Sequence, residues 1–402
     1  MLRQFSWIAF GRLFSAVLQF LTFVLLANKV SPAEFGMVAA VVGAAIVPQS
    51  FLDFGISTYI ISARAAGGQD ARVAFALQLN NRISLVFAFL ALIALFLMGI
   101  IIDPIFIALC PLAFWAAGEK NADTWLGVAI ADGDAHLNLI GLMGRRVLSL
   151  LLLLVGFALS FDAPVVYSCA MAIAAFGAAC FAQLVVRRRL PTASGGSIRE
   201  TLSLSRPYWL HSFATQLRNV DAAVVALVGS PAQAGYYSVA SRISGPLRLV
   251  PTSLASVLLP GVAKEGKISV RTTKLIILTL AGMAVMYGLI VATAPLLIPS
   301  LMGAAYTHSV MPVQAMCVGL IFGAAASMFA AILQGLGEQK FVARSSMASS
   351  LACIPAIILG TIWLGATGAS IGFVSSFLLQ TFLFSIKLFQ RRQRRKHGRH
   401  RG

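Results

Sequence analysis

Charge is scarce in this sequence, and negative charge is the scarcest. Only 11% of the 402 residues are charged, with 13 Asp and Glu against 31 Lys and Arg, whereas 59% are hydrophobic. Soluble domains carry roughly 25% charged residues, and a chain of this length cannot hide so much apolar surface from water. The composition therefore excludes a cytosolic enzyme and a disordered chain, and it indicates a protein that crosses a membrane several times.

Cysteines and cofactor-binding motifs are equally sparse. The five cysteines lie in apolar segments without C-x-x-C spacing, which argues against a disulfide framework and against a metal site. The segment from Gly261 to Lys267 approaches a phosphate-binding loop, but Ile268 follows where that motif needs Ser or Thr. The sequence thus predicts no catalytic residue, no metal and no cofactor, in a protein that is not an enzyme.

Long apolar runs are abundant, and their number predicts the fold class. A membrane-spanning helix needs about 20 predominantly apolar residues. We therefore expect an all-α polytopic membrane protein with about twelve transmembrane helices. The expected spans are 6–28, 37–60, 80–102, 104–130, 139–161, 163–186, 207–229, 232–259, 272–298, 310–334, 341–364 and 366–388.

The basic residues predict the orientation of these spans. With the N-terminus inside, 25 of the 31 Lys and Arg lie on the cytosolic side, among them Arg145 and Arg146 before the apolar part of the fifth span. This bias follows the positive-inside rule and predicts that both termini are cytosolic. The basic tail, residues 391–402, is expected to bind anionic membrane lipids and not nucleic acid.

An internal repeat predicts two halves. Shifting the chain by 199 residues aligns the hexapeptide that begins at Ser31-Pro32 with the one that begins at Ser230-Pro231. Each half holds six spans, an even number, so both halves enter the membrane in the same sense. We expect six-helix bundles over residues 1–198 and 199–390, related by a pseudo-two-fold axis along the membrane normal and separated by a midplane cavity.

The first helix of each half carries a polar stripe. At 100° per residue one face of the first span gathers Arg12, Ser15, Gln19 and Thr22, and the seventh span gathers His211, Thr215 and Arg218 with Asp221 at the edge. A charge facing hydrocarbon costs at least 2–3 kcal/mol. Both stripes are therefore expected to face an internal cavity.

Short motifs give the chain a family resemblance. Gly11-Arg12 before an apolar helix, Ser31 to Gly36, Asp53-Phe54-Gly55 and Leu333 to Gly337 resemble the polysaccharide transporter and O-antigen flippase family of the multidrug/oligosaccharidyl-lipid/polysaccharide exporter superfamily. The resemblance implies two bundles that flip an undecaprenyl-pyrophosphate-linked oligosaccharide across the bacterial inner membrane by alternating access, for lipopolysaccharide or exopolysaccharide synthesis. It also implies a glycan polymerase as a partner.

A pyrophosphate headgroup needs buried cations that hold phosphate oxygens by charge-assisted hydrogen bonds. The candidates for binding the substrate are Arg12, Gln19, His211, Arg218, Arg242 and Arg248. Alternatives stay open: Arg12 reaches the cytosolic headgroups, Arg218 pairs with Asp221, or one of Arg242 and Arg248 faces the interface beside the Gly245-Pro246 kink.

The fourth span carries the candidates for ion coupling. Intramembrane carboxylates commonly serve as proton or cation relays, so Glu119, Lys120 and Asp123, together with Asp221, are expected to bind a proton or a sodium ion. The alternative is a locally neutralised cluster in which Lys120 reaches Asp123 at i+3.

Two other functions remain possible from the sequence. A multidrug or cation antiporter of the same superfamily predicts acidic cavities, whereas the spans here are rich in arginine. A membrane-embedded glycan polymerase or transferase normally needs a large outer loop, and every expected outer loop is short.

Overall fold

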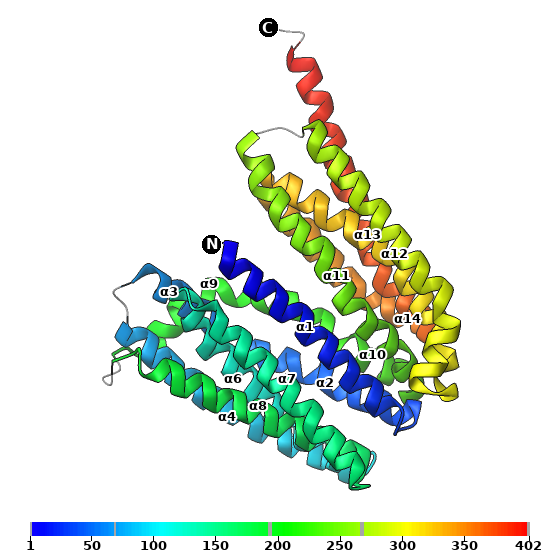
Figure 1. The fold of residues 1–402 in the computed structure, drawn as a ribbon. Helices are drawn as coiled ribbons and strands as arrows, with labels where there is room; N and C mark the ends of the chain where they lie inside the picture. Colours follow the sequence, from blue (N-terminus) through cyan, green and yellow to red (C-terminus); the bar gives the residue numbers. More distant parts are fainter. Residues whose placement is uncertain (1, 68–69, 192–194, 266–268, 400–402) are drawn as a thin grey trace. The chain divides into compact units, whose positions relative to one another are not determined.

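The fold is all-α in the part of the chain that the structure describes. The computed structural model describes residues 2–67, 70–191, 195–265 and 269–399, which form helices and short turns without a strand (Figure 1). Contacts divide the chain into two compact units, Met1–Ala223 and Val224–Gly402. This division by contacts comes after residue 223, because the helix that follows residue 198 packs on the first unit. The two six-helix halves over residues 1–198 and 199–390 stay a prediction, and so does the pseudo-two-fold axis.

The first unit holds the helices that correspond to the first six expected spans and the start of the seventh. They are α1 (Leu2–Ala27), α2 (Pro32–Leu52), α3 (Ile56–Ala66), α4 (Asp70–Ile101), α5 (Ile105–Ala108), α6 (Leu112–Ala131), α7 (Ala135–Ala158), α8 (Ala163–Arg187), α9 (Ile198–Gln216) and the 3₁₀ helix η1 (Leu217–Val220). The next helix, α10 (Asp221–Val228), crosses the division.

The second unit holds fewer and longer helices. They are α11 (Pro231–Glu265), α12 (Val270–Met302), η2 (Ala304–Ser309), α13 (Val310–Gly335) and α14 (Gln339–Arg399). The last of these contains a break at Leu364 and Gly365, whose backbones are not helical. This break separates the last two expected spans.

The repeated Ser-Pro motif starts a helix in both units, as its sequence predicts. Ser31 caps α2 by accepting a hydrogen bond from the amide of Glu34, whose carboxylate accepts one from the amide of Ser31. This reciprocal pair is a capping box, which satisfies free amides at the helix start. At the start of α11, Ser230 likewise accepts from the amide of Gln233 at 3.2 Å.

The second expected span is interrupted at Asp53-Phe54-Gly55. Phe54 and Gly55 have φ values of 48° and 77°, which end α2 and begin α3. A Cβ atom on Gly55 would lie 2.6 Å from the backbone of Ser205 and of Trp209 on α9. Glycine is therefore required here for two reasons, the left-handed backbone and the close approach of α9.

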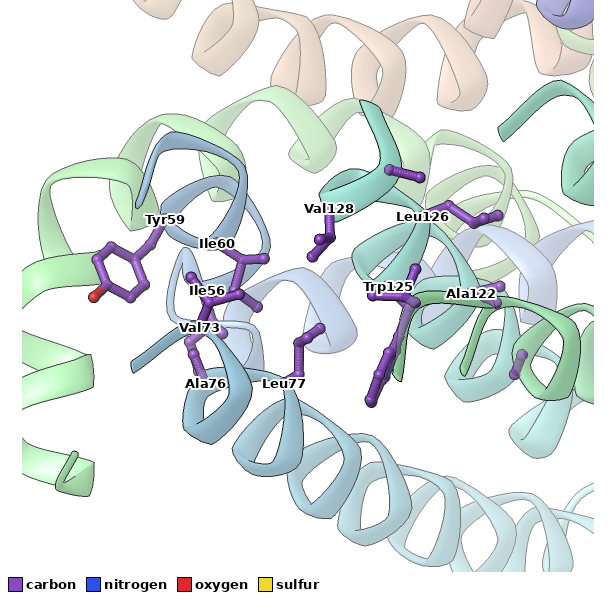
Figure 2. Packing of buried hydrophobic residues seen from close by; sticks show 14 of the residues in the cluster. Ile56, Tyr59, Ile60, Val73, Ala76, Leu77, Ala122, Trp125, Leu126 and Val128 are labelled. Atoms are coloured by element: carbon purple, nitrogen blue, oxygen red, sulfur yellow. The ribbon is translucent and has the colours of Figure 1, made fainter. Parts of the chain in front are cut away.

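Small and apolar side chains pack the core of the first unit. Ile56 and Ile60 of α3, Leu77 of α4 and Leu126 of α6 are all nearly or completely buried in one cluster (Figure 2). Alanines of α8 complete the cluster and allow α6 and α8 to approach closely. This packing holds α6, which carries the charged residues of the fourth span, against its neighbours.

Glycines at positions 319 and 368 allow close helix packing in the second unit. A Cβ on Gly319 would overlap the side chain of Val374, and one on Gly368 would meet the carbonyl of Gly360. Segment 368–372 also spells G-x-S-x-G, but its Ser370 is fully buried within α14. It is therefore a packing segment and not the exposed strand-to-helix turn that a nucleophilic serine needs.

The helices are apolar enough for a membrane. By length and composition, seven helical segments of the described chain can cross one: Pro32–Leu52, Asp70–Ile101, Ala135–Ala158, Ala163–Arg187, Thr272–Met302, Ala304–Gly335 and Gln339–Arg391. Many of their large apolar side chains are exposed, such as Ile100 and Ile101 on α4. Such a surface suits lipid and not water.

Candidate functional site

A buried ionic network joins α6 to α7 in the first unit. Glu119 of α6 accepts a hydrogen bond from the guanidinium of Arg146 and lies 3.4 Å from a second guanidinium nitrogen, that of Arg145. Arg145 also donates to Asp123 at 2.8 Å. The two arginines are only 6% and 7% exposed, so most of their charge is neutralised inside the protein.

We expected Arg145 and Arg146 on the cytosolic side before the apolar part of the fifth span, and the structure buries both side chains inside the first unit. They lie near the middle of α7, a continuous helix over Ala135–Ala158, and are buried. Two buried arginines are tolerated because Glu119 and Asp123 approach from the neighbouring helix. The orientation of the chain rests on the remaining basic residues and stays a prediction.

Lys120 has a different partner from the one expected. Its ammonium lies 3.3 Å from Asp53 Oδ1 at the break between α2 and α3, and not on Asp123, which Arg145 holds. Asp53 is buried and also accepts a hydrogen bond from Ser57 at 2.6 Å. Lys120 therefore pairs with a carboxylate outside its own helix, and not with Asp123 at i+3.

The polar stripe of α1 faces the interior of the first unit. Ser15 and Thr22 are buried, and Gln19 is half-buried. Ser15 Oγ accepts a hydrogen bond from Arg146 Nε at 3.4 Å, so the stripe joins the ionic network through α7. The side chain of Arg12 lies outside the described residues.

The helix that carries the second stripe is not an unbroken α-helix, contrary to the prediction. It changes to the 3₁₀ helix η1 at residues 217–220, so Arg218 lies between α9 and α10. The carbonyl oxygen of Asn219 in η1 lies close to Gly43 of α2, where a Cβ atom on residue 43 would overlap it. This contact therefore requires glycine at position 43. The side chains of His211 and Arg218 lie outside the described residues, and Asp221 is buried, its carboxylate accepting from the amide of Ala222.

Arg242 and Arg248 lie on α11 of the second unit, and both are half-buried. The Arg248 guanidinium lies 5.0 Å from the ring centre of Phe377 and 6.0 Å from that of Phe373. Both rings are buried on α14. Cation–π contacts of this kind attract the guanidinium to the faces of the two rings.

A second ionic cluster closes one end of the first unit. Arg64 at the end of α3 contacts Asp70 and Asp132, each at 2.6 Å, and Arg189 contacts Asp132 and Asp134 at 3.3 and 2.7 Å. Burial raises the pKa of the Asp132 carboxyl, but hydrogen bonds from Arg64 and Arg189 outweigh it, so this pKa lies below its ordinary value. The two carboxylates of the Asp132-Gly133-Asp134 turn are thus used in ion pairs.

From the sequence we identified the acidic residues of this network but not the arginines, Arg145 and Arg146, that pair with them. The signal was present: two carboxylates one turn apart on the fourth span, Glu119 and Asp123, and two adjacent arginines inside the neighbouring expected span. Opposite charges inside adjacent membrane helices are expected to pair. In the described part of the chain, no group of three or more His, Cys, Asp or Glu side chains is arranged to hold a metal ion.

Solved structures show which fold this is. The chain is similar to an inward-facing multidrug resistance MATE family transporter of the MOP superfamily, with TM-score 0.73, 16% identity, and 94% of each chain covered. It is also similar to the inward-closed lipid II flippase MurJ, with TM-score 0.69, 14% identity, and 96% of this chain and 87% of that chain covered. The fold is therefore that of the MOP superfamily transporters.

A third neighbour is of interest for its charge. A MOP superfamily transporter from Pyrococcus furiosus, described as having a binding pocket of reverse polarity, matches with TM-score 0.64 at 16% identity over 96% of this chain and 95% of that chain. None of the curated proteins matches this sequence. The family model described as polysaccharide biosynthesis protein matches residues 25–312, which is most of the chain. The chain accordingly belongs to the polysaccharide biosynthesis protein family, and its fold is similar to that of MOP superfamily transporters.

Proposed function

We propose that this protein flips an undecaprenyl-pyrophosphate-linked oligosaccharide from the cytosolic to the outer leaflet of the bacterial inner membrane. The observation that carries the proposal is the match to the polysaccharide biosynthesis family over residues 25–312. A lipid-linked saccharide is the form in which such a pathway presents its sugar to a membrane transporter. The similar fold of a lipid II flippase supports the same kind of cargo.

The residues proposed to hold the pyrophosphate are the intramembrane cations and their polar neighbours. They are Arg12, Gln19, His211, Arg218, Arg242 and Arg248. Arginine suits this task because its planar fork of donors matches two phosphate oxygens and stays charged at any physiological pH. The lipid tail is proposed to remain in the bilayer while the headgroup crosses between the two halves by alternating access.

Energy is proposed to come from an ion gradient that acts through Glu119, Lys120, Asp123 and Asp221. Carboxylates held inside a membrane protein change charge when they take up a proton, and this change is able to bias two conformations. Both termini are proposed to be cytosolic, with the tail after residue 391 on anionic lipid. A glycan polymerase is the partner that would consume the exported saccharide.

Flipping in proteoliposomes tests the function directly. The purified full chain is reconstituted with an undecaprenyl-pyrophosphate saccharide, and the fraction accessible to an external sugar-modifying enzyme is followed in time. We expect the wild-type protein to expose the saccharide, and Arg218→Ala to slow this about tenfold or more through the loss of a charge-assisted contact to phosphate. The proposal is wrong if protein-free liposomes expose the saccharide as fast as those with wild-type protein.

The second candidate function is multidrug extrusion, and the MATE structures favour it. It predicts that the same proteoliposomes export a cationic dye in exchange for protons or sodium ions. Dye export without saccharide flipping would select this function. Saccharide flipping without dye export selects the proposed one.

A further inference from the structure

The arginine pair of α7 borders a small cavity inside the first unit. The cavity is small, about 10 Å³, which is room for about one water molecule. Its lining includes Trp115 and Glu119 of α6, Arg145 and Arg146 of α7, and the small Ala174 of α8. The five residues come from three helices that pack directly on one another. This arrangement gathers two guanidinium groups and one carboxylate around a single space.

One polar atom on this cavity has no hydrogen-bond partner among the described residues. It is Arg145 Nε, which is buried, whereas the indole of Trp115 lies in hydrogen-bond contact with Glu119. Buried polar groups without partners are rare and costly, so each needs an explanation. Arg145 is more than nine-tenths buried, and its free donor marks a place where an acceptor is missing.

The charges around the cavity determine which class of ligand fits. A sodium ion needs several oxygen ligands, whereas the lining offers one carboxylate between two guanidinium groups that repel a cation. A phosphate group presents acceptor oxygens that match the donors of adjacent arginines. The obstacle is Glu119, which already occupies both arginines.

We propose that Arg145 and Arg146 form an anion site for the phosphate class of ligand, in which Glu119 and the incoming phosphate exchange places. When the phosphate binds between the two guanidinium groups, Glu119 leaves them and takes up a proton. The anion then uses the volume that the carboxylate vacates together with the adjoining cavity. This inference rests on the proposed function, because the pyrophosphate of the cargo is the anion that would reach the site.

The groups around Glu119 allow this exchange. Arg145 and Arg146 of α7 face it, and Asp123 and Lys120 share its helix, with Asp53 of α2 beyond Lys120. The lining residues of α8 are Met171, Ala174 and Ala175, which do not titrate. Between α6 and α4, the side-chain oxygen of Asn81 accepts hydrogen bonds from Asn121 Nδ2 and Trp125 Nε1. Protonation of Glu119 therefore removes the negative charge that holds Arg146.

The exchange predicts the direction in which the affinity for the anion changes with pH. If one proton is taken up for each anion bound, the affinity rises as the pH falls, by up to about tenfold per pH unit. Glu119→Gln abolishes the carboxylate, so this variant is expected to bind the anion tightly and without the pH dependence. The matched control is Asp53→Asn, because Asp53 is another buried, ion-paired carboxylate of the same unit that does not line the cavity.

The experiment measures binding of radiolabelled sulfate, an oxyanion that resembles phosphate but does not titrate between pH 5.5 and 8, to the detergent-purified full chain over that range. We expect affinity to rise at least tenfold toward pH 5.5 for the wild-type protein and for Asp53→Asn, and to stay high and level for Glu119→Gln. A level profile in the wild-type protein overturns the proposal, and this arm does not depend on the folding of any variant. A wild-type slope that persists in folded Glu119→Gln also overturns it, because another group then takes the proton.

A second arm distinguishes the source of the anion and separates this inference from the proposed function. Undecaprenyl pyrophosphate in nanodiscs is expected to compete with the bound sulfate; failure to compete overturns the assignment to a lipid headgroup. Flipping with a level binding profile leaves the proposed function standing and removes the anion site. The expected slope without flipping keeps the site and removes the proposed function.

Discussion

The two units differ in what they bury. Among the residues whose burial the structure describes, the charged side chains that are buried all belong to the first unit: Asp53, Arg145, Arg146 and Asp221. The second unit buries serine and threonine instead. Among the described residues, the first unit thus buries charged side chains, whereas the second unit buries neutral polar ones.

Two similar turns, one in each unit, allow the helices of the two units to be compared residue by residue. Gly133 and Gly337 both have positive φ, at 95° and 88°, and each is followed by a residue whose amide bonds a carbonyl five residues earlier. Aligning these turns places Ser349 and Ser350 of α14 at the positions of Arg145 and Arg146 of α7. Both serines bond to carbonyls of their own helix, so they need no partner on α13.

The helices opposite these positions differ in the same way. The α6 helix carries Glu119, Lys120 and Asp123, whereas α13 has no charged residue over Val310–Gly335. Charged pairs in low dielectric require matched partners on both helices. The charges of α6 and α7 therefore form one ion-paired set, whereas α14 has serines at the positions aligned with Arg145 and Arg146.

The largest effect is expected from leaving a buried arginine without its carboxylate. Glu119→Ala removes the acid that Arg146 contacts and should lower the free energy of unfolding by about 3 kcal/mol. Ser350→Ala, at the position equivalent to Arg146, should cost less than about 1 kcal/mol, since it loses a bond within one helix. Thermal unfolding of both variants in one detergent checks the contrast. Equal losses would show that the first unit does not depend on its charges.

The helix break offers a second contrast. Gly55→Ala places a side chain on a left-handed backbone against α9 and should destabilise the protein by about 2 kcal/mol. Gly245→Ala on α11 meets nothing within 4 Å and should be neutral or stabilising by about 0.5 kcal/mol. Differential scanning fluorimetry of the two variants measures this. If Gly55→Ala is as stable as the wild-type protein, the break does not need a left-handed residue.

Arg248 provides a smaller test in the second unit. Arg248→Gln keeps a polar side chain but loses the contact with the rings of Phe373 and Phe377. The loss is expected to be about 0.5–1 kcal/mol of stability. Urea unfolding followed by tryptophan fluorescence checks it, with Arg248→Lys as the control that keeps a cation. A larger loss in the lysine variant than in the glutamine variant would contradict a cation–π role.

The smallest effect is a dependence on pH at the end of the first unit. Because the pKa of Asp132 is lowered in the folded protein, its carboxylate stabilises the fold above the unfolded pKa of about 3.9. That stabilisation is lost as the pH falls through the folded value. Asp132→Asn should therefore be less stable than the wild-type protein at pH 7 and equally stable in strong acid. A difference that persists unchanged in acid would exclude this ion pair as its cause.

Much of the fold could be predicted because membrane helices are long and apolar. The runs at 163–186 and 310–334 closely match α8 and α13. The breaks were harder, since apolar sequence continues through them. Nothing local to Arg218 announces η1, and the change to 3₁₀ geometry becomes understandable only when Asn219 is seen against Gly43 of α2.

The candidate site could be predicted only in part, for a physical reason. The charges within the fourth span could be read from the sequence. A helical wheel, however, shows only neighbours on the same helix, so the partner considered for Lys120 was Asp123. In the folded protein the partners come from other helices, Asp53 for Lys120 and Arg145 for Asp123. Charge in a membrane protein is satisfied across helices, and this requires the tertiary arrangement.

The central claim is that the protein carries a pyrophosphate-linked saccharide on intramembrane arginines. Native mass spectrometry of the full chain, purified gently from cells that make such a saccharide, tests it most directly. We predict a bound species with the mass of a polyprenyl pyrophosphate saccharide, which inorganic pyrophosphate displaces. Binding of ordinary phospholipids alone, with no displaceable polyprenyl species from cells in which its presence has been verified, would contradict the account.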